Sequence, residues 1–195
     1  MNILNKTLKN IFFPLFGLVI LSNCGGDDPI APPNEEELIT TVKVVFTPTT
    51  GTPVTMKYYD EDGGNGAAAP VVTGGTLDAN TVYSVTLEIL NESENPAEDI
   101  SEEIKEEAED HQFFFEISSS LNLTHTSYDD QDGNGNPLGL ENTFTTGAAS
   151  NGTLKVILRH EADKSASGVS DGDITNAAGE TDVETLPAID ITIVD

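Results

Sequence analysis

The residues best suited to chemistry in this sequence form one acidic loop, residues 130–141, which reads DQDGNGNPLGLE. It fits the pattern D-x-[DN]-x-[DN]-G-x5-E of calcium-binding loops at every fixed position. In such loops alternate oxygens turn onto a hard cation, a glycine permits the bend, and the last acid supplies a bidentate carboxylate. The predicted calcium ligands are Asp130, Asp132, Asn134, Asn136 and Glu141. Strands are predicted on both sides, so we predict a calcium loop in a β-connection, with a metal-free Asn/Asp/Gly turn as the alternative.

A second acidic loop repeats part of this motif. Residues 59–66 (YDEDGGNG) recur as residues 128–135 (YDDQDGNG). The first copy has no ligating side chain at the fifth position of the calcium pattern and no acid at the twelfth. Asp60 and Asp62 are therefore weaker metal-ligand candidates.

The three histidines share a position within their strands. His111, His125 and His160 each extend the apolar face of a predicted strand, so each is expected to point inwards at a strand end. If neighbouring strands turn as hairpins, the three imidazoles meet at one end of the fold, where zinc or copper is a suitable ion. The carboxylates expected nearby are Glu107, Asp110 and Glu161. The alternative is that partly buried histidines cap the core and hydrogen-bond acidic neighbours.

Composition and motifs exclude several functions. Lys and Arg number 8 against 34 Asp and Glu, a net charge of −26, so nucleic acid is not an expected partner. The single cysteine excludes an internal disulfide. The chain has no G-x-S-x-G elbow and no Walker A loop, and its acids are too abundant to single out a glycosidase pair. We therefore do not expect an enzyme.

The N-terminus has the layout of a bacterial lipoprotein signal. Lys6 and Lys9 precede an apolar segment, residues 11–21, which is too short to span a bilayer. It ends in LSNC, residues 21–24, which resembles the lipobox in which the cysteine is acylated and becomes the mature N-terminus. We predict that residues 1–23 are a signal peptide and that Cys24 is lipidated.

A Gly- and Pro-rich segment, residues 24–37, follows the cysteine and is expected to be a flexible tether. Its acidic residues shortly after Cys24 resemble the surface-export signal of Bacteroidetes lipoproteins. The expected location is the outer membrane, with the protein lipid-anchored and facing the cell surface.

Residues 38–195 alternate mostly with period two, which is typical of half-buried strands. The predicted strands are centred on residues 42–46, 54–58, 85–89, 113–117, 121–123, 154–158 and 189–193, with 142–146 as a weaker eighth. Short strands between Gly/Asn/Asp turns predict a mainly β fold, a single antiparallel β-sandwich of about 7–8 strands.

Two segments depart from this alternation. Asn95 and Pro96 followed by acidic residues are typical of a helix start, and Ile100, Ile104 and Ala108 recur at helical spacing. We predict one inserted amphipathic helix at about 96–110. Residues 161–187 are acidic and nearly free of large apolar side chains, so we predict a long, mobile acidic loop there.

The stretch from Leu38 to Val194 resembles a group of small Bacteroidetes and flavobacterial outer-membrane lipoproteins. The matching features are residues 98–104 (EDISEEI), 107–114 (EAEDHQFF), 130–140 (DQDGNGNPLGL) and the strand 154–160. The group is commonly labelled type 1 periplasmic binding fold superfamily protein, a label that implies a pair of doubly wound α/β domains. The length and strand pattern of this chain favour the sandwich instead. The resemblance implies an envelope lipoprotein beside a TonB-dependent transporter.

These observations predict a non-enzymatic outer-membrane lipoprotein that captures a ligand or metal for a TonB-dependent transporter and carries a calcium-stabilised loop. One alternative is a structural or adhesive envelope module whose calcium only stiffens loops. A less favoured alternative is a metal-dependent hydrolase, which would need a metal ion with an open coordination position.

Overall fold

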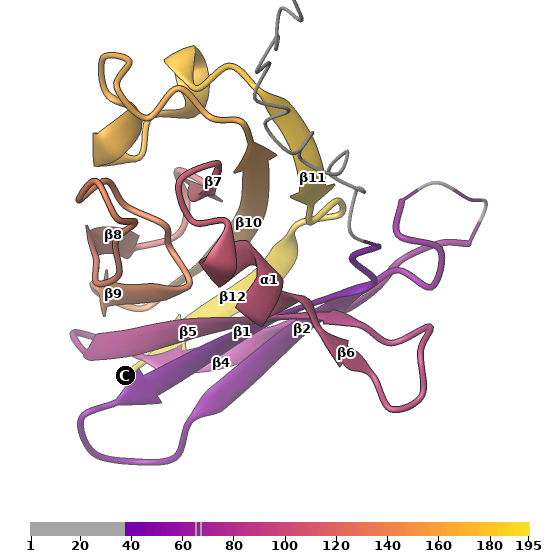
Figure 1. The fold of residues 1–195 in the computed structure, drawn as a ribbon. Coiled ribbons are helices and arrows are strands. Elements are labelled where there is room, and N and C mark those ends of the chain that lie inside the picture. Colours follow the sequence, from indigo (N-terminus) through magenta and orange to yellow (C-terminus); the bar gives the residue numbers. More distant parts are fainter. Residues whose placement is uncertain (1–37, 65, 67) are drawn as a thin grey trace, which may run out of the picture. The chain divides into compact units, whose positions relative to one another are not determined.

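The computed structural model describes residues 38–64, 66 and 68–195 (Figure 1). They form a mainly β structure of two packed sheets, which confirms the predicted fold class. Cys24, the predicted signal peptide and the predicted tether lie outside the described residues. None of the helices in the described ranges has the length and apolar character needed to cross a membrane.

The first sheet has seven strands in the order β3-β2-β1-β5-β9-β8, with β6 paired to β5. Its strands are β1 (Thr41–Pro48), β2 (Val54–Tyr59), β3 (Val71–Thr73), β5 (Val82–Asn91), β6 (Glu98–Asp99), β8 (Leu123–Tyr128) and β9 (Glu141–Thr146). All of these neighbours are antiparallel. The register places Val42 opposite Ile89 and Val44 opposite Leu87, so alternate apolar residues line one buried face.

The second sheet has five strands arranged around β10. They are β4 (Gly75–Asp78), β7 (His111–Ile117), β10 (Ser150–His160), β11 (Glu180–Glu184) and β12 (Ile189–Val194). The first part of β10 pairs with β12 and its last part with β11, while β7 pairs with residues 154–160 of β10. Strand β4 extends the sheet by pairing parallel to β12.

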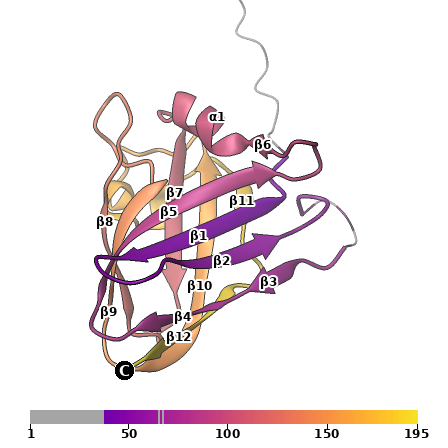
Figure 2. The same ribbon diagram turned by 90° about the horizontal axis from the view of Figure 1, so that it is seen from below.

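The core lies between the two sheets, whose strands run across one another (Figure 2). Phe46 makes edge-to-face contacts with Tyr83 and Phe144, at centroid distances of 5.7 and 5.8 Å. Phe113 and Leu154 of the second sheet are fully buried in the same cluster. Burial of these large side chains is the main stabilising term, and it holds the strand ends in fixed positions.

Seven of the eight segments predicted as strands lie in strands of the structure, and the eighth, 121–123, overlaps β8 only at Leu123. The other strands in the described ranges are β3, β4, β6 and β11, which have only 2 to 5 residues. Alternation over so few residues is too short to distinguish a strand from a turn.

The helix is shorter than predicted. Helix α1 spans Ile100–Glu106 rather than about 96–110, and it follows directly on β6 (Figure 2). Residues 98–99 pair with β5 in extended conformation, so the helix begins only after them. Asp99, not Asn95, is the N-cap, and its side chain accepts a hydrogen bond from the Ser101 N–H. Ile100 and Ile104 are buried, as the spacing predicts.

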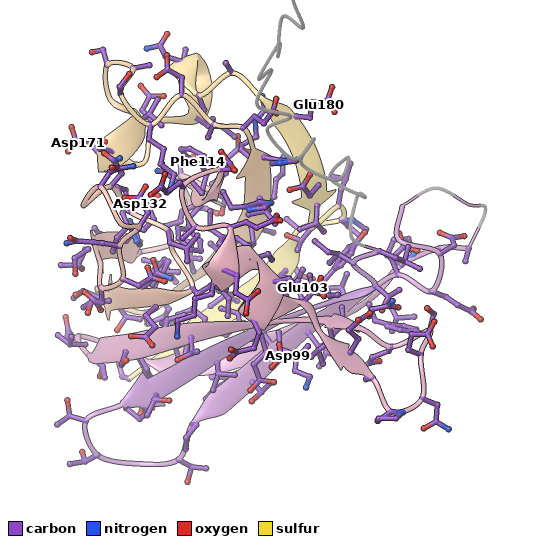
Figure 3. All side chains as sticks on the ribbon, in the orientation of Figure 1. Asp99, Glu103, Phe114, Asp132, Asp171 and Glu180 are labelled. Atoms are coloured by element: carbon purple, nitrogen blue, oxygen red, sulfur yellow. The ribbon has the colours of Figure 1, made fainter. Side chains whose placement is uncertain are left out.

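Residues 161–187 are not the irregular loop that the composition predicts. They contain two 3-10 helices, η1 (Val169–Asp171) and η2 (Ile174–Asn176), and strand β11. A second small apolar cluster fixes the segment against the outer face of the second sheet, where Figure 3 labels Phe114. Its buried members are Phe114, Ile157, Val169 and Ala177. A few well-placed small apolar residues are thus enough to pack a segment that is acidic overall.

Candidate metal centre

A pair of histidines and an aspartate meet at one end of the second sheet. His111 begins β7, His160 ends β10, and the two are opposite each other in the strand register. Their rings stack with centroids 4.7 Å apart and an interplanar angle of 12°. Asp182 of β11 places Oδ2 3.5 Å from His111 Nε2 and Oδ1 3.9 Å from His160 Nδ1. One potential ligand atom from each residue lies within 4.8 Å of the others.

A β-bulge directs Asp182 towards the histidines. Leu158 is opposite Val183 and Arg159 is opposite Thr181, so Asp182 is the extra residue on β11. An extra residue bends the strand and changes the direction of a side chain. The Arg159 guanidinium donates a hydrogen bond of 2.6 Å to Thr181 Oγ1 and holds the strand next to the bulge.

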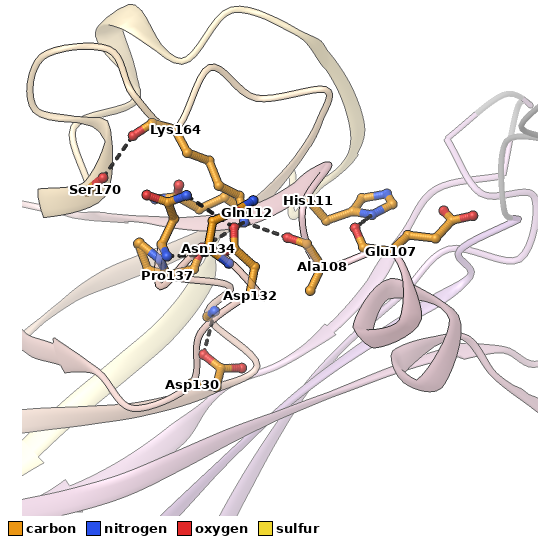
Figure 4. A network of polar contacts seen from close by, with 12 residues as sticks. Glu107, Ala108, His111, Gln112, Asp130, Asp132, Asn134, Pro137, Lys164 and Ser170 are labelled. Carbon is orange, nitrogen blue, oxygen red and sulfur yellow. Dashed lines mark hydrogen bonds and ion pairs between the residues drawn. The ribbon is translucent and has the colours of Figure 1, made fainter.

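The main chain fixes the proton on His111. Its Nδ1 lies 3.1 Å from the carbonyl oxygen of Glu107, which can only accept, so Nδ1–H is the donor (Figure 4). In the neutral ring, Nε2 then carries a lone pair directed at the Asp182 carboxylate. That arrangement is unfavourable unless a proton or a metal ion lies between the two atoms. Histidines that ligate metals usually donate their other N–H to a carbonyl or carboxylate in this way.

The distances are close to those of a tetrahedral metal site. Ligand atoms about 2.0–2.2 Å from a zinc ion lie about 3.3–3.6 Å from one another. The His111–Asp182 separation of 3.5 Å matches, and the His160–Asp182 separation of 3.9 Å is slightly longer. The stacked rings have to tilt for their nitrogens to converge. Two imidazoles and one carboxylate suit zinc or copper and leave a coordination position open.

The Asp182 carboxylate is nearly buried and therefore needs a cationic partner. The side chains of His111, Asp182 and His160 are 0%, 9% and 17% exposed. An ionised carboxylate with so little solvent is costly unless a cation compensates it. Either a protonated imidazole or a metal ion meets this need, and the first of these is the alternative in which histidines cap the core and bind acidic neighbours.

The structure brings together two of the three histidines. Strands β7 and β8 belong to different sheets, so the chain crosses the sandwich between them and the assumed hairpin does not form. His125 therefore lies in the first sheet, against Phe115 and Phe144, with Nε2 3.0 Å from Asn142 Oδ1. Glu107, Asp110 and Glu161 do not belong to the cluster of ligand atoms either.

Asp182 is the member of the cluster that the sequence does not reveal. It lies in a segment predicted to be a loop. A weak signal is present, because Thr181 and Val183 are β-branched residues two positions apart, as in a strand. A bulge changes which side chains face inwards, however, and alternation alone does not locate it.

Backbone N–H groups bind the Asp130 carboxylate, which is the first predicted ligand of the calcium loop (Figure 4). The Asp130 carboxylate accepts three backbone N–H donors, from Gly139, Leu140 and Glu141, at 2.7, 2.9 and 3.1 Å. The Glu141 side chain is at the surface. The carboxylate expected to begin a calcium site therefore closes the loop on its own backbone.

The third and seventh positions are used in the same way. Asp132 Oδ1 accepts the N–H groups of Asn134 and Asn136, both at 2.9 Å. Asn136 is at the seventh position, where a calcium loop uses the backbone carbonyl, and here that carbonyl accepts the Asp132 N–H at 2.8 Å. Gly135 has a φ of +85°, which is the bend that the pattern predicts.

A buried lysine supplies the cation of this loop. Lys164 Nζ donates to Asp132 Oδ2 at 3.0 Å and to the carbonyls of Pro137 and Ala108 at 3.0 and 2.5 Å (Figure 4). Burial raises the pKa of the Asp132 carboxyl, but its N–H donors and Lys164 outweigh this, so the pKa is lowered. Calcium binding stays a prediction, and these contacts favour its alternative, a turn closed by the protein's own groups.

The first acidic loop follows β2. Asp60 is buried, with Oδ2 3.4 Å from the Tyr58 hydroxyl and Oδ1 3.4 Å from the Asp62 N–H. Asp62 accepts the Ala68 N–H at 3.1 Å, and this hydrogen bond is the main reason that its pKa is lowered. Asp62 therefore helps to close its loop, while Asp60 faces a cavity. A metal site here stays a prediction.

The candidate metal centre is thus formed by residues from three neighbouring strands, β7, β10 and β11. Folds of this kind serve many functions, so the function has to be argued from the residues of the site and not from the fold. No protein-family model, curated protein or solved structure matches this chain.

Proposed function

We propose that this protein is a lipid-anchored, non-enzymatic module of a bacterial outer membrane that captures one zinc or copper ion at His111, His160 and Asp182. The observation that carries the proposal is the convergence of these three ligands, with the His111 Nδ1–H held by the Glu107 carbonyl. In the neutral ring this hydrogen bond places the lone pair on Nε2, which is the tautomer that ligates a metal ion through Nε2.

The position of the site supports capture and release of the ion. It lies where strands begin and end, and the His160 side chain is partly exposed. Asp182 also lines a cavity. A metal that only stabilises a fold is more often enclosed by four protein ligands, whereas the described residues supply three here.

The proposed lipid anchor and the proposed partner are inferred from the sequence. The lipobox-like residues 21–24 support lipidation at Cys24, and acylation with more than one chain gives firm anchoring. The resemblance to envelope lipoproteins supports a TonB-dependent transporter as the partner that receives the ion. A module at the cell surface would supply such a transporter with bound metal.

Metal titration tests the proposal. The full chain carrying Cys24→Ser contains no thiol that could bind metal, since Cys24 is its sole cysteine. Equilibrium dialysis against Zn²⁺ and Cu²⁺, followed by elemental analysis, should give one ion per chain. We expect His111→Gln and His160→Gln each to weaken binding by about tenfold or more, because each removes one ligand.

The third histidine provides the matched control. His125→Gln makes the same chemical change outside the cluster and should leave the affinity unchanged. The electron paramagnetic resonance spectrum of bound Cu²⁺ should show coupling to imidazole nitrogens that is reduced by His111→Gln. Absence of stoichiometric binding, or equal weakening by His125→Gln, would show that the histidine pair is only a protonated structural contact.

A further inference from the structure

A cavity of about 320 Å³ adjoins the metal centre, between the first acidic loop and β11. One wall comprises Leu38, Ile39, Tyr58, Asp60 and the glycines at 63 and 64. The other wall is formed by residues 180–184 of β11. Asp182 belongs to this wall and also to the metal centre, so the two sites share a side chain.

The cavity is strongly acidic. Asp60, Glu180, Asp182 and Glu184 line it, and no basic residue is among its described lining residues. Glu184 is neutralised by Lys155, whose Nζ lies 2.6 Å from Glu184 Oε1. Within the described residues, Asp60 and Glu180 form no ion pair with a lysine or arginine. An acidic, partly enclosed space concentrates cations near it.

Asp60 is poorly compensated within this space. It is 4% exposed, and among the described residues its two carboxylate oxygens have hydrogen-bond partners only at 3.4 Å. Hydrogen bonds from strong donors to a carboxylate are usually about 2.7–2.9 Å long. Burial raises the pKa of the neighbouring Tyr58 hydroxyl, and the Asp60 charge raises it further. A cation in the cavity would offset the desolvation of Asp60.

Asp182 gives a second, independent indication of a cation. Its side chain is 9% exposed, and Oδ2 is buried without a hydrogen bond among the described residues. In the part of the chain that the structure describes, Asp182 thus presents an oxygen that accepts no hydrogen bond and has His111 Nε2 3.5 Å away, at the boundary between the cavity and the histidines. A cation moving from Asp60 to the histidines would meet a carboxylate at each step.

We propose that this cavity is the route by which the metal ion enters, with Asp60 as a transient oxygen ligand before the ion is transferred to His111, His160 and Asp182. This inference rests on the proposed metal centre. The occupant is the hydrated divalent ion itself, since carboxylates bind it without requiring it to lose all of its water.

The rate of metal binding tests the route. The chain lacks tryptophan, so quenching of tyrosine emission by Cu²⁺ reports association in a stopped-flow instrument, with Tyr58 in the cavity wall. We expect Asp60→Asn to slow association about 3- to 10-fold at low salt. Dissociation should slow by a similar factor, so the equilibrium affinity should change by less than twofold. The difference in association rate between Asp60→Asn and the unmodified protein should become smaller at 0.5 M salt, where charges are screened within a few ångströms.

Two further variants make the result specific. Glu180 is exposed on β11 (Figure 3), and Glu180→Gln should slow association less than Asp60→Asn without endangering the fold. Glu61→Gln is the matched control, because Glu61 is exposed in the same loop and does not line the cavity. It removes the same charge and should leave the rate nearly unchanged.

The outcomes separate the two proposals. Stoichiometric binding with an unchanged rate in Asp60→Asn and Glu180→Gln overturns the entry route and leaves the metal centre intact. Equal slowing by Glu61→Gln overturns it as well, because only the net charge would then matter. A loss of affinity without slower association would make Asp60 a permanent ligand. Absence of binding by the unmodified site would refute the metal centre first and the route with it.

Discussion

Replacing Lys164 by methionine should destabilise the domain strongly. The Lys164 and Asp132 side chains are 4% and 1% exposed, and their charged atoms are 3.0 Å apart. Methionine retains most of the aliphatic chain but removes the ammonium group. It leaves the Asp132 carboxylate without its cation and the carbonyls of Pro137 and Ala108 without this donor.

The expected loss is about 3–5 kcal/mol, because removing one partner of a buried ion pair leaves an uncompensated charge. For a domain of this size, that corresponds to a decrease in Tm of roughly 6–20 °C. Lys155→Met is the matched control: Lys155 contacts Glu116 and Glu184 at 3.1 and 2.6 Å, but its side chain is 23% exposed. Exposed pairs contribute about 0–1 kcal/mol, so the control should lose little.

Urea unfolding followed by circular dichroism measures both variants. The double variant Asp132→Asn/Lys164→Met should lose about 0.5–3 kcal/mol less than the sum of the single variants, since it leaves neither charge buried alone. The pH dependence gives a second readout. The pKa of Asp132 is lowered in the folded protein, so its contribution is present above the unfolded value of about 3.9 and is lost as the pH falls through the folded pKa. Equal destabilisation by Lys164→Met and Lys155→Met would refute the assignment of a buried internal cation.

Three further outcomes are expected. Burial lowers the pKa of His125, so the unfolded chain binds more protons than the folded protein below about pH 6.5. The free energy of unfolding, measured in urea, should therefore decrease from pH 7 to pH 5. His125→Gln should reduce this decrease, and an unchanged pH dependence in the variant would contradict the prediction. Cys24→Ser should release the protein from the membrane fraction in cell fractionation, and continued retention would contradict lipidation. Because Lys164 compensates the Asp132 carboxylate, the melting curves should be identical in 1 mM calcium and in EDTA. A calcium site with a Kd of about 10⁻⁴ M would instead raise the free energy of unfolding by about 1.4 kcal/mol. A calcium-dependent rise in Tm that Asp132→Ala abolishes would establish the calcium loop.

The longer strands were predictable because alternation is a local property of the chain. β1, β5 and β10 contain regular runs of buried apolar residues, and no knowledge of their partners is needed to recognise them. The inward direction of His111 and His160 follows from the same alternation. Their meeting depends on the pairing of β7 with β10, which is set by the sandwich topology and not by local sequence.

The remaining features depend on contacts between distant segments. Asp182 joins the histidines through a bulge, and Lys164 reaches the Asp130 loop from a segment whose composition predicts only a loop. The calcium pattern identified a real bend and a real set of inward-facing oxygens. It did not distinguish an external ion from the protein's own donors, because backbone N–H groups satisfy the Asp130 carboxylate and Lys164 compensates that of Asp132.

The proposed metal centre joins three strands that are distant from one another in the sequence: β7, β10 and β11. A bound ion would therefore act as a reversible cross-link that closes two long loops of the chain. Unlike a disulfide, such a link is lost when the chain unfolds and its ligands separate, so it stabilises the folded state by an amount that increases with the concentration of free metal. Since the sole cysteine is at the predicted lipidation position, the chain cannot form an internal disulfide, and the ion would take over that role. The mechanical resistance of the domain would then vary with the supply of metal around the cell.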